Sequence, residues 1–251
     1  MDLTLYGVNL WAGLILFARI GAMLTLLPGV GEATVPTNVR LGFAILFTAL
    51  LAPSLEASVP EMPDGVFGLA GIVTSEVLIG AMFGAAARIL VSSLSTAGQI
   101  IGLETGLAFA QTTDPTQGQA GQIFGAFLGM MGIALMFATG LVGMFIRGVA
   151  GTYDVVSLGA PVPVSDATEM AVGAFSAAFR VGFQIATPLI VGGLMFRVGL
   201  GVLTRLIPQI QAFFVVLPLQ MLGGFFIIAL GLSTGMLVWL ESLDRFADWL
   251  R

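Results

Sequence analysis

The sequence predicts an all-α, polytopic membrane protein built of helical hairpins, and three observations support this fold class. Hydrophobic residues make up 57% of the 251 residues and charged residues 9%, whereas soluble domains carry about 25% charged residues. The mean hydropathy is +1.04. The apolar runs are also too long for the strands of a membrane barrel, which have about 10 residues of alternating polarity.

About six apolar runs follow one another along the chain, and each predicts a helix. Glycines, prolines and polar turn residues separate them. The second run is short for a bilayer span, which needs about 20 residues. We expect this run to end at Pro53 and the fifth run to be kinked at Pro188. The runs are 5–27, 40–52, 66–94, 123–146, 170–203 and 212–240.

Several residue types that carry chemistry are absent from the chain. The sequence contains no Cys and no His, which excludes disulfides and removes the commonest metal ligand and acid–base group. All nine basic residues are Arg, so a phosphate-binding loop with its lysine is excluded. The net charge of −5 and the lack of a basic patch argue against nucleic acid. We expect neither an enzyme nor a cofactor.

Charged side chains interrupt the apolar runs. A charge within a membrane helix costs about 2.5–3.5 kcal/mol on insertion scales, so such residues pair or face a cavity. A proton or solute relay and inter-helix or inter-subunit pairing in an assembly both fit, and the absence of His favours pairing. Glu76 and Arg88 lie about 120° apart around a helix, so we expect each to meet a partner elsewhere. The residues concerned are Arg19, Glu76, Arg88, Arg180 and Arg197.

The most unusual stretch is 98–121, which reads GQIIGLETGLAFAQTTDPTQGQAG. It is rich in glycine, glutamine and threonine, yet long apolar runs flank it. Lipid cannot satisfy irregular backbone, so we expect this stretch to line a water-filled path. A discontinuous-helix site of a stand-alone secondary transporter and a plain surface loop are the alternatives. From its last residue onward, Gly121, Gly125 and Gly129 recur every fourth residue, a spacing that allows close helix contact.

Three blocks, in order along the chain, resemble the FliR family of flagellar type III export-gate proteins. The first is RIGAMLTLLPGVGEATVPTNVRLGFAILFTALLAPSL (19–55), the second GLETGLAFAQTTDP (102–115) and the third LTRLIPQIQAFFVVLPLQMLGG (203–224). Many members carry a Gly-His pair where this chain has Gly140-Leu141.

The resemblance implies a channel subunit that passes unfolded flagellar proteins across the bacterial inner membrane at the flagellar basal body. It implies FliP-like and FliQ-like subunits as partners in a helical hetero-oligomeric core, which FlhB-like and FlhA-like proteins and lipid surround. It also implies a FliP-like part (1–166) and a FliQ-like hairpin with a short amphipathic tail (167–251). The equivalent subunit of a virulence injectisome is an alternative.

The resemblance also suggests roles for individual residues. The expected gate, or plug, lies between Gly106 and Gln119 within the central stretch, and a second set is expected to serve packing and assembly. The gate residues are Gly106, Leu107, Phe109, Gln111, Asp114, Pro115, Gln117 and Gly118. The packing residues are Arg19, Pro36, Arg40, Glu76, Arg88, Gly121, Gly125, Gly129, Arg205, Pro208 and Gln209.

Overall fold

The computed structural model describes residues 4–5, 8–107, 120–206 and 212–249. Apart from a small antiparallel hairpin of β1 (Thr4–Leu5) and β2 (Val8–Asn9), the elements in this part of the chain are helices, so the all-α fold class is confirmed. The chain forms two compact units. Unit 1 holds Met1–Leu90, Met136–Phe175 and Leu243–Arg251, and unit 2 holds Val91–Leu135 and Ser176–Ser242.

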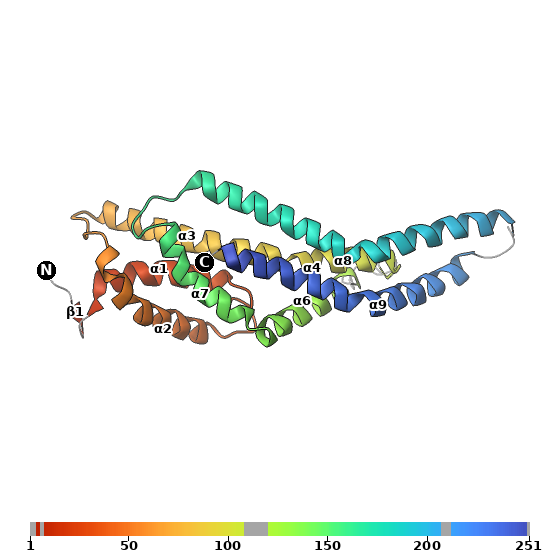
Figure 1. Cartoon of the computed structure of the whole chain (residues 1–251), viewed down its shortest axis with the longest axis horizontal. Coiled ribbons are helices and arrows are strands. Elements are labelled where there is room, and N and C mark those ends of the chain that lie inside the picture. The colour runs from red at the N-terminus through yellow and green to blue at the C-terminus, as the bar shows by residue number, and fades with distance from the viewer. Residues whose placement is uncertain (1–3, 6–7, 108–119, 207–211, 250–251) are drawn as a thin grey trace. The chain divides into compact units, whose positions relative to one another are not determined.

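Figure 1 shows the helices along the chain. Four of those described are long and apolar enough to cross a membrane, or up to five if the bent pair α6–α7 is one span. The helices are α1 (Leu10–Leu26), α2 (Thr37–Leu55), the 3-10 turn η1 (Glu56–Ser58), α3 (Val66–Val91), α4 (Ser93–Glu104), α6 (Ala120–Ala138), α7 (Leu141–Val155), α8 (Val164–Leu206) and α9 (Ala212–Trp249).

Helix α1 forms the core of unit 1. Ile15, Leu16, Ile20 and Met23 are fully buried, although α1 has only 17 residues. Helix α2, next to it in Figure 1, belongs to a 22-residue apolar stretch and is mostly exposed. The expectation that the second apolar run is short for a bilayer span was therefore wrong. Helix α2 extends beyond the run at both ends, and it continues through Pro53.

Two glycines let α3 approach the backbone of α1. A Cβ at Gly80 would collide with the carbonyl oxygen of Arg19, and a Cβ at Gly84 would lie 2.7 Å from that of Met23. The contacts advance by four residues on both helices, so α1 and α3 run parallel. Such a small-xxx-small pair permits close backbone contact.

The sequence predicts one helix over the run 123–146, but the structure has two there. Helix α6 ends at Ala138 and α7 begins at Leu141, with a bend of 75° between them. Gly140 has φ +76 at this break, a left-handed conformation that glycine adopts without strain. Helix α7 then continues to Val155, beyond the end of the run 123–146.

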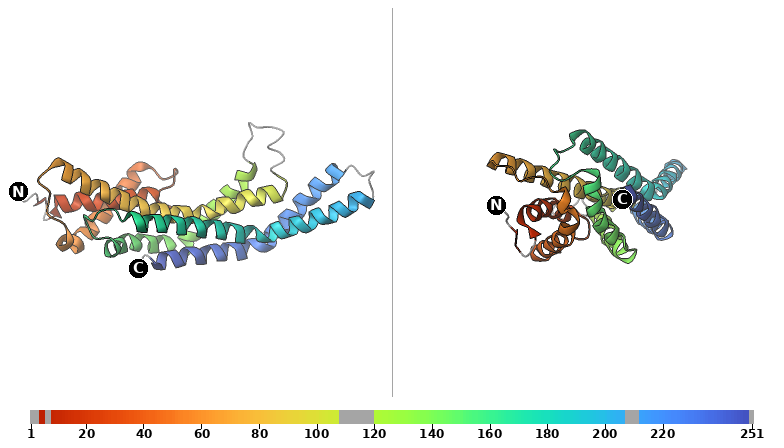
Figure 2. Two further views of the ribbon diagram at one scale, coloured as in Figure 1. Left: turned by 90° about the horizontal axis from the view of Figure 1, so that it is seen from above. Right: turned by 60° about the vertical axis from the view of Figure 1, so that its left-hand side comes forward.

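In unit 2, α4 packs against α6, and the two long helices α8 and α9 run antiparallel. A Cβ at Gly98 of α4 would collide with the backbone of Gly125 of α6. Gly192 and Gly235 lie against Ile227 and Ile185 across the α8–α9 pair, and Figure 2 shows these helices side by side. Helix α8 is continuous through Pro188, where the sequence predicts a kink.

Candidate functional site

Helix α4 ends where the central polar segment begins, and the last helical turn is closed by hydrogen bonds. The Thr105 N–H and its Oγ1 both donate to the carbonyl of Ile101, at 2.9 and 2.8 Å. Gly106 has φ +77 and donates its N–H to Leu103 O at 3.2 Å. A left-handed glycine just past the last helical residues is a common helix terminator. The sequence Glu104-Thr105-Gly106 therefore fixes the point where α4 stops.

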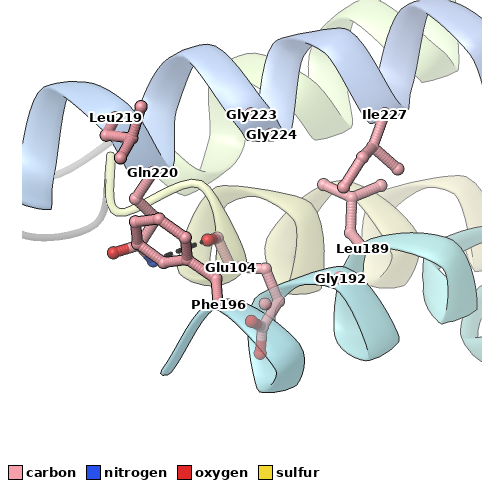
Figure 3. A pocket seen from close by; sticks show the side chains of 10 residues that line it. Glu104, Leu189, Gly192, Phe196, Leu219, Gln220, Gly223, Gly224 and Ile227 are labelled. Carbon is pink, nitrogen blue, oxygen red and sulfur yellow. Dashed lines mark hydrogen bonds between the residues drawn. The ribbon is translucent and has the colours of Figure 1, made fainter. Parts of the chain in front are cut away.

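Glu104 is held from two other helices of unit 2. Arg197 Nη2 of α8 donates to Glu104 Oε2 at 2.8 Å. Gln220 Nε2 of α9 donates to the main-chain oxygen of Glu104 at 2.7 Å, the dashed line in Figure 3. The Glu104 side chain is 15% exposed and that of Arg197 55%. Because one bond uses the carboxylate and the other the backbone, both parts of Glu104 are anchored.

Glycines on α8 and α9 make room for the end of α4. A Cβ at Gly193 of α8 would collide with the Glu104 carboxylate. A Cβ at Gly224 of α9 would lie 2.6 Å from Thr105 Cγ2. A larger residue at Gly193 would shift the Glu104 carboxylate, and one at Gly224 would press on Thr105 next to its backbone. The close approach of α9 to the end of α4 therefore depends on Gly224.

A cavity of about 120 Å³ lies between α8 and α9 beside Glu104. Figure 3 shows Glu104, Phe196 and Gln220 toward one end, and Leu189 and Ile227 toward the other. The polar side chains thus gather at one end, and the other end is apolar. Within the described residues, no group of His, Cys, Asp or Glu could hold a metal ion. This arrangement can anchor a chain segment, whereas it lacks a nucleophile–base pair.

A second polar cluster lies in the interior of unit 1. Arg19 on α1 and Glu76 on α3 form a fully buried ion pair, with Arg19 Nε 2.6 Å from Glu76 Oε2. Arg19 Nη1 also donates to the carbonyls of Thr152 and Val156, at 3.1 and 2.7 Å. These carbonyls lie at the C-terminal end of α7, where helices carry unpaired acceptors. A cation is favoured there.

The Glu76 carboxylate and the face of the guanidinium have further partners, whereas the buried Tyr153 hydroxyl has no hydrogen-bond partner among the described residues. Glu76 Oε1 accepts a hydrogen bond from the Gly159 N–H at 2.7 Å. The Tyr153 ring covers the guanidinium, with Arg19 Cζ 4.5 Å from the ring centroid, a favourable cation–π distance. The pair therefore joins α1 and α3 to the end of α7 and to the turn that follows it.

Other predicted packing residues take several positions. Pro36 is the N-cap residue of α2, and Arg40 donates to the carbonyls of Glu32 and Val35. Arg88 lies 3.9 Å from Glu32, with both side chains partly exposed. Gly125 is in close contact with α4, whereas a Cβ at Gly129 would meet open space. Arg205 is exposed near the end of α8, and Gly121 lies in α6.

The structure describes the first two residues of the predicted gate. Gly106 and Leu107 are described, and Leu107 is partly exposed. Phe109, Gln111, Asp114, Pro115, Gln117 and Gly118 lie outside the described residues, as do the expected packing residues Pro208 and Gln209. The stretch 98–104, expected to be irregular, belongs to α4.

The anchoring residues were missed as a group. Arg197 had been noted as a charge within an apolar run, but its partner Glu104 is 93 positions away along the chain, and Gln220 had been assigned no role. The signals present in the sequence were the polar residues within apolar runs and the pairs Gly192-Gly193 and Gly223-Gly224.

Comparisons with known proteins agree on one family. The model of the bacterial export proteins, family 1, matches residues 10–246. The chain is 38% identical to the flagellar biosynthetic protein FliR of Caulobacter vibrioides, over 96% of each chain. It is 31% identical to FliR of Pectobacterium carotovorum, over 93% of this chain and 90% of that protein. For FliR of Escherichia coli, the identity is 29% over 84% and 80%. The chain therefore belongs to the bacterial export proteins of family 1, the family of the flagellar biosynthetic protein FliR.

Proposed function

We propose that this chain is a core channel subunit of the flagellar type III export gate, and that it passes unfolded flagellar proteins across the bacterial inner membrane. The observation that carries the proposal is the similarity to flagellar FliR proteins along nearly the whole chain. The proposed role is structural rather than enzymatic. It consists of forming and closing a path for another polypeptide.

The surface of unit 2 supports a role inside an assembly. Large apolar side chains on α8 and α9 are between 59 and 71% exposed, and contact with water is unfavourable for apolar side chains. They are Leu194, Met195, Val198, Leu222, Phe226 and Leu230. Residues 176–206 of α8 would measure about 45 Å, whereas the bilayer core is about 30 Å thick. A hairpin longer than the bilayer favours contacts with other subunits in addition to lipid.

We further propose that the segment 106–119 is the gate of this channel. Its polar, glycine-rich sequence supports this role, since glycines let a segment move without strain. The anchored end of α4 supports it as well, because a movable segment needs a fixed base. Glu104 provides that base through Arg197 and Gln220.

The proposed partners are FliP-like and FliQ-like subunits in the core, with FlhB-like and FlhA-like proteins around it. The division into a FliP-like part (1–166) and a FliQ-like part (167–251) is also a proposal. Helix α8 begins at Val164, close to that boundary, while the two compact units interleave across it.

Purification of a tagged full-length chain in mild detergent, with identification of what accompanies it, tests this function. We expect an obligate hetero-oligomer that contains apolar helical subunits of the export apparatus. The chain expressed without these partners serves as the control and should be unstable. A monodisperse, folded monomer that binds a small solute would instead favour a stand-alone transporter.

A further inference from the structure

Helix α8 exposes the charged residue Arg180 beside exposed apolar side chains such as Phe179 and Phe183. Arg180 is exposed, and within the described part of the chain it has no carboxylate partner. The other three arginines that had been noted inside apolar runs do have one. Arg19 pairs with Glu76, Arg88 lies near Glu32, and Arg197 pairs with Glu104. A charge left alone on an apolar helix is costly.

Arg180 belongs to a continuous exposed line along α8, which we call the α8 seam. The spacing of three or four residues places its members on one side of the helix. Every member is exposed, whereas Val181, Ile185 and Leu189 on the opposite side are buried within unit 2. The seam consists of Ser176, Arg180, Gln184, Thr187, Val191, Leu194, Val198 and Val202.

The α8 seam changes character along its length. Its first four members, Ser176 to Thr187, are polar, and its last four, Val191 to Val202, are apolar with 51 to 62% exposure. Apolar residues at spacings of three and four form the contact line between packed helices. Polar side chains within such a line bond across the interface when the surroundings are apolar.

From this pattern we infer that the α8 seam is the docking line for an apolar helix of a different subunit, and that this helix carries a carboxylate opposite Arg180. The guanidinium offers a planar fork of donors that matches a carboxylate. Ser176 and Gln184, one helical turn to either side, supply further hydrogen-bonding groups. The inference concerns the surface of this chain and holds whatever the assembly transports.

A lipid headgroup fits the α8 seam less well than a protein helix does. The polar half from Ser176 to Thr187 extends about 16 Å along the helix axis. One headgroup layer of a bilayer is about 5–8 Å deep, so a helix crossing the membrane would hold part of this polar line inside the hydrocarbon. A second helix packed alongside α8 matches a lengthwise line of this length.

A photo-crosslinking residue in place of Gln184 or of Val198, in the full chain within intact cells, tests which molecule covers the seam. The control is the same residue in place of Phe179, which is 61% exposed and lies about 100° around the helix from Arg180. We expect both seam positions to capture one membrane subunit, and the control to capture it much less. Adducts with lipid alone, or with an exported polypeptide alone, would overturn the inference.

The charge is tested by Arg180→Glu and Arg180→Lys, with Arg147→Glu as the same charge change on an exposed arginine outside the seam. Arg180→Glu sets two carboxylates against each other. We expect about a tenfold or larger fall in the captured subunit that co-purifies, since an unpaired charge is left buried. Arg180→Lys should retain it, and a carboxylate-to-Arg change in the subunit should restore binding to Arg180→Glu. Unchanged co-purification with Arg180→Glu overturns the inference, and the crosslinks decide the matter if that variant does not accumulate.

Discussion

Arg19 and Glu76 are both fully buried, and their bond of 2.6 Å joins two residues that are 57 positions apart along the chain. The same guanidinium binds carbonyls at the end of α7, and the same carboxylate binds Gly159 N–H. Removing one member of a buried pair leaves the other charge without compensation, which typically costs about 3–5 kcal/mol. This cluster therefore stabilises unit 1 through three separate segments.

We predict that Glu76→Gln lowers the amount of assembled complex more than it lowers transport per assembled complex. The amide keeps the shape of the side chain but leaves Arg19 charged and buried, so the free energy of unfolding should fall by up to about 3–5 kcal/mol. Denaturation in detergent and export per purified complex measure the two effects. Glu169→Gln, which changes an exposed acid, should alter neither. A fully assembled complex without export would instead make Glu76 a functional group.

We predict that alanine substitutions at Gly140 and Gly129 change the stability of the protein in opposite directions. At φ +76, alanine is strained by about 1–2 kcal/mol, and open space around Gly140 means that no clash adds to this. Gly140→Ala should therefore lower the unfolding temperature. Gly129→Ala, within α6 and also in open space, should raise the free energy of unfolding by up to about 1 kcal/mol. Equal effects of the two substitutions would contradict this account.

The hydrophobic runs predicted the helices because the length of an apolar run is a local property of the sequence. The ends were less predictable. Pro53, where an end was predicted, lies inside α2, because a proline removes one hydrogen bond and the rest of the ladder can persist. The break at Gly140 was missed since a single glycine inside an apolar run is compatible with a continuous helix.

The anchored base of the central segment could not be predicted from the sequence for a different reason. Glu104 meets Arg197 and Gln220 only when three helices pack together, so the pairing is a property of the tertiary structure. The sequence did indicate that Arg197 needs a partner. It carried no information on which acid would supply it.

We predict that Gly224→Ala disturbs this base and that Gly223→Ala does not. The new methyl group at Gly224 would lie 2.6 Å from Thr105 Cγ2, and Thr105 is buried and bonded to Ile101. Overpacking of this kind costs about 1–3 kcal/mol. A Cβ at Gly223, the neighbouring residue, meets open space. Thermal unfolding of the assembled complex compares the Gly224→Ala and Gly223→Ala variants. Equal stability of the two would show that α9 can shift away from Thr105 at little cost.

The last prediction concerns the proposed gate, most of which lies outside the described residues. A gate must close firmly enough to hold ions back and loosely enough for a passing polypeptide to displace it. Leu107 and Phe109 could contribute about 1.5–3 kcal/mol each if fully buried, which is a suitable range for a closure that opens repeatedly. Glycines near them let the segment swing without strain.

Deleting Thr112 to Gly118 separates a gate from a plain connecting loop. The helices and the anchor at Glu104 are left intact, so the complex should still assemble. If the segment closes the channel, cells that are not exporting should leak ions or small solutes through the assembled complex, and ion flux with a membrane-potential dye measures this. A Glu169→Gln variant, which changes an exposed acid outside the deleted stretch, is the control for general damage to the complex. If the deletion variant assembles and the membrane stays as tight as with the unaltered chain, closure belongs to another part of the assembly, and the segment merely joins α4 to α6.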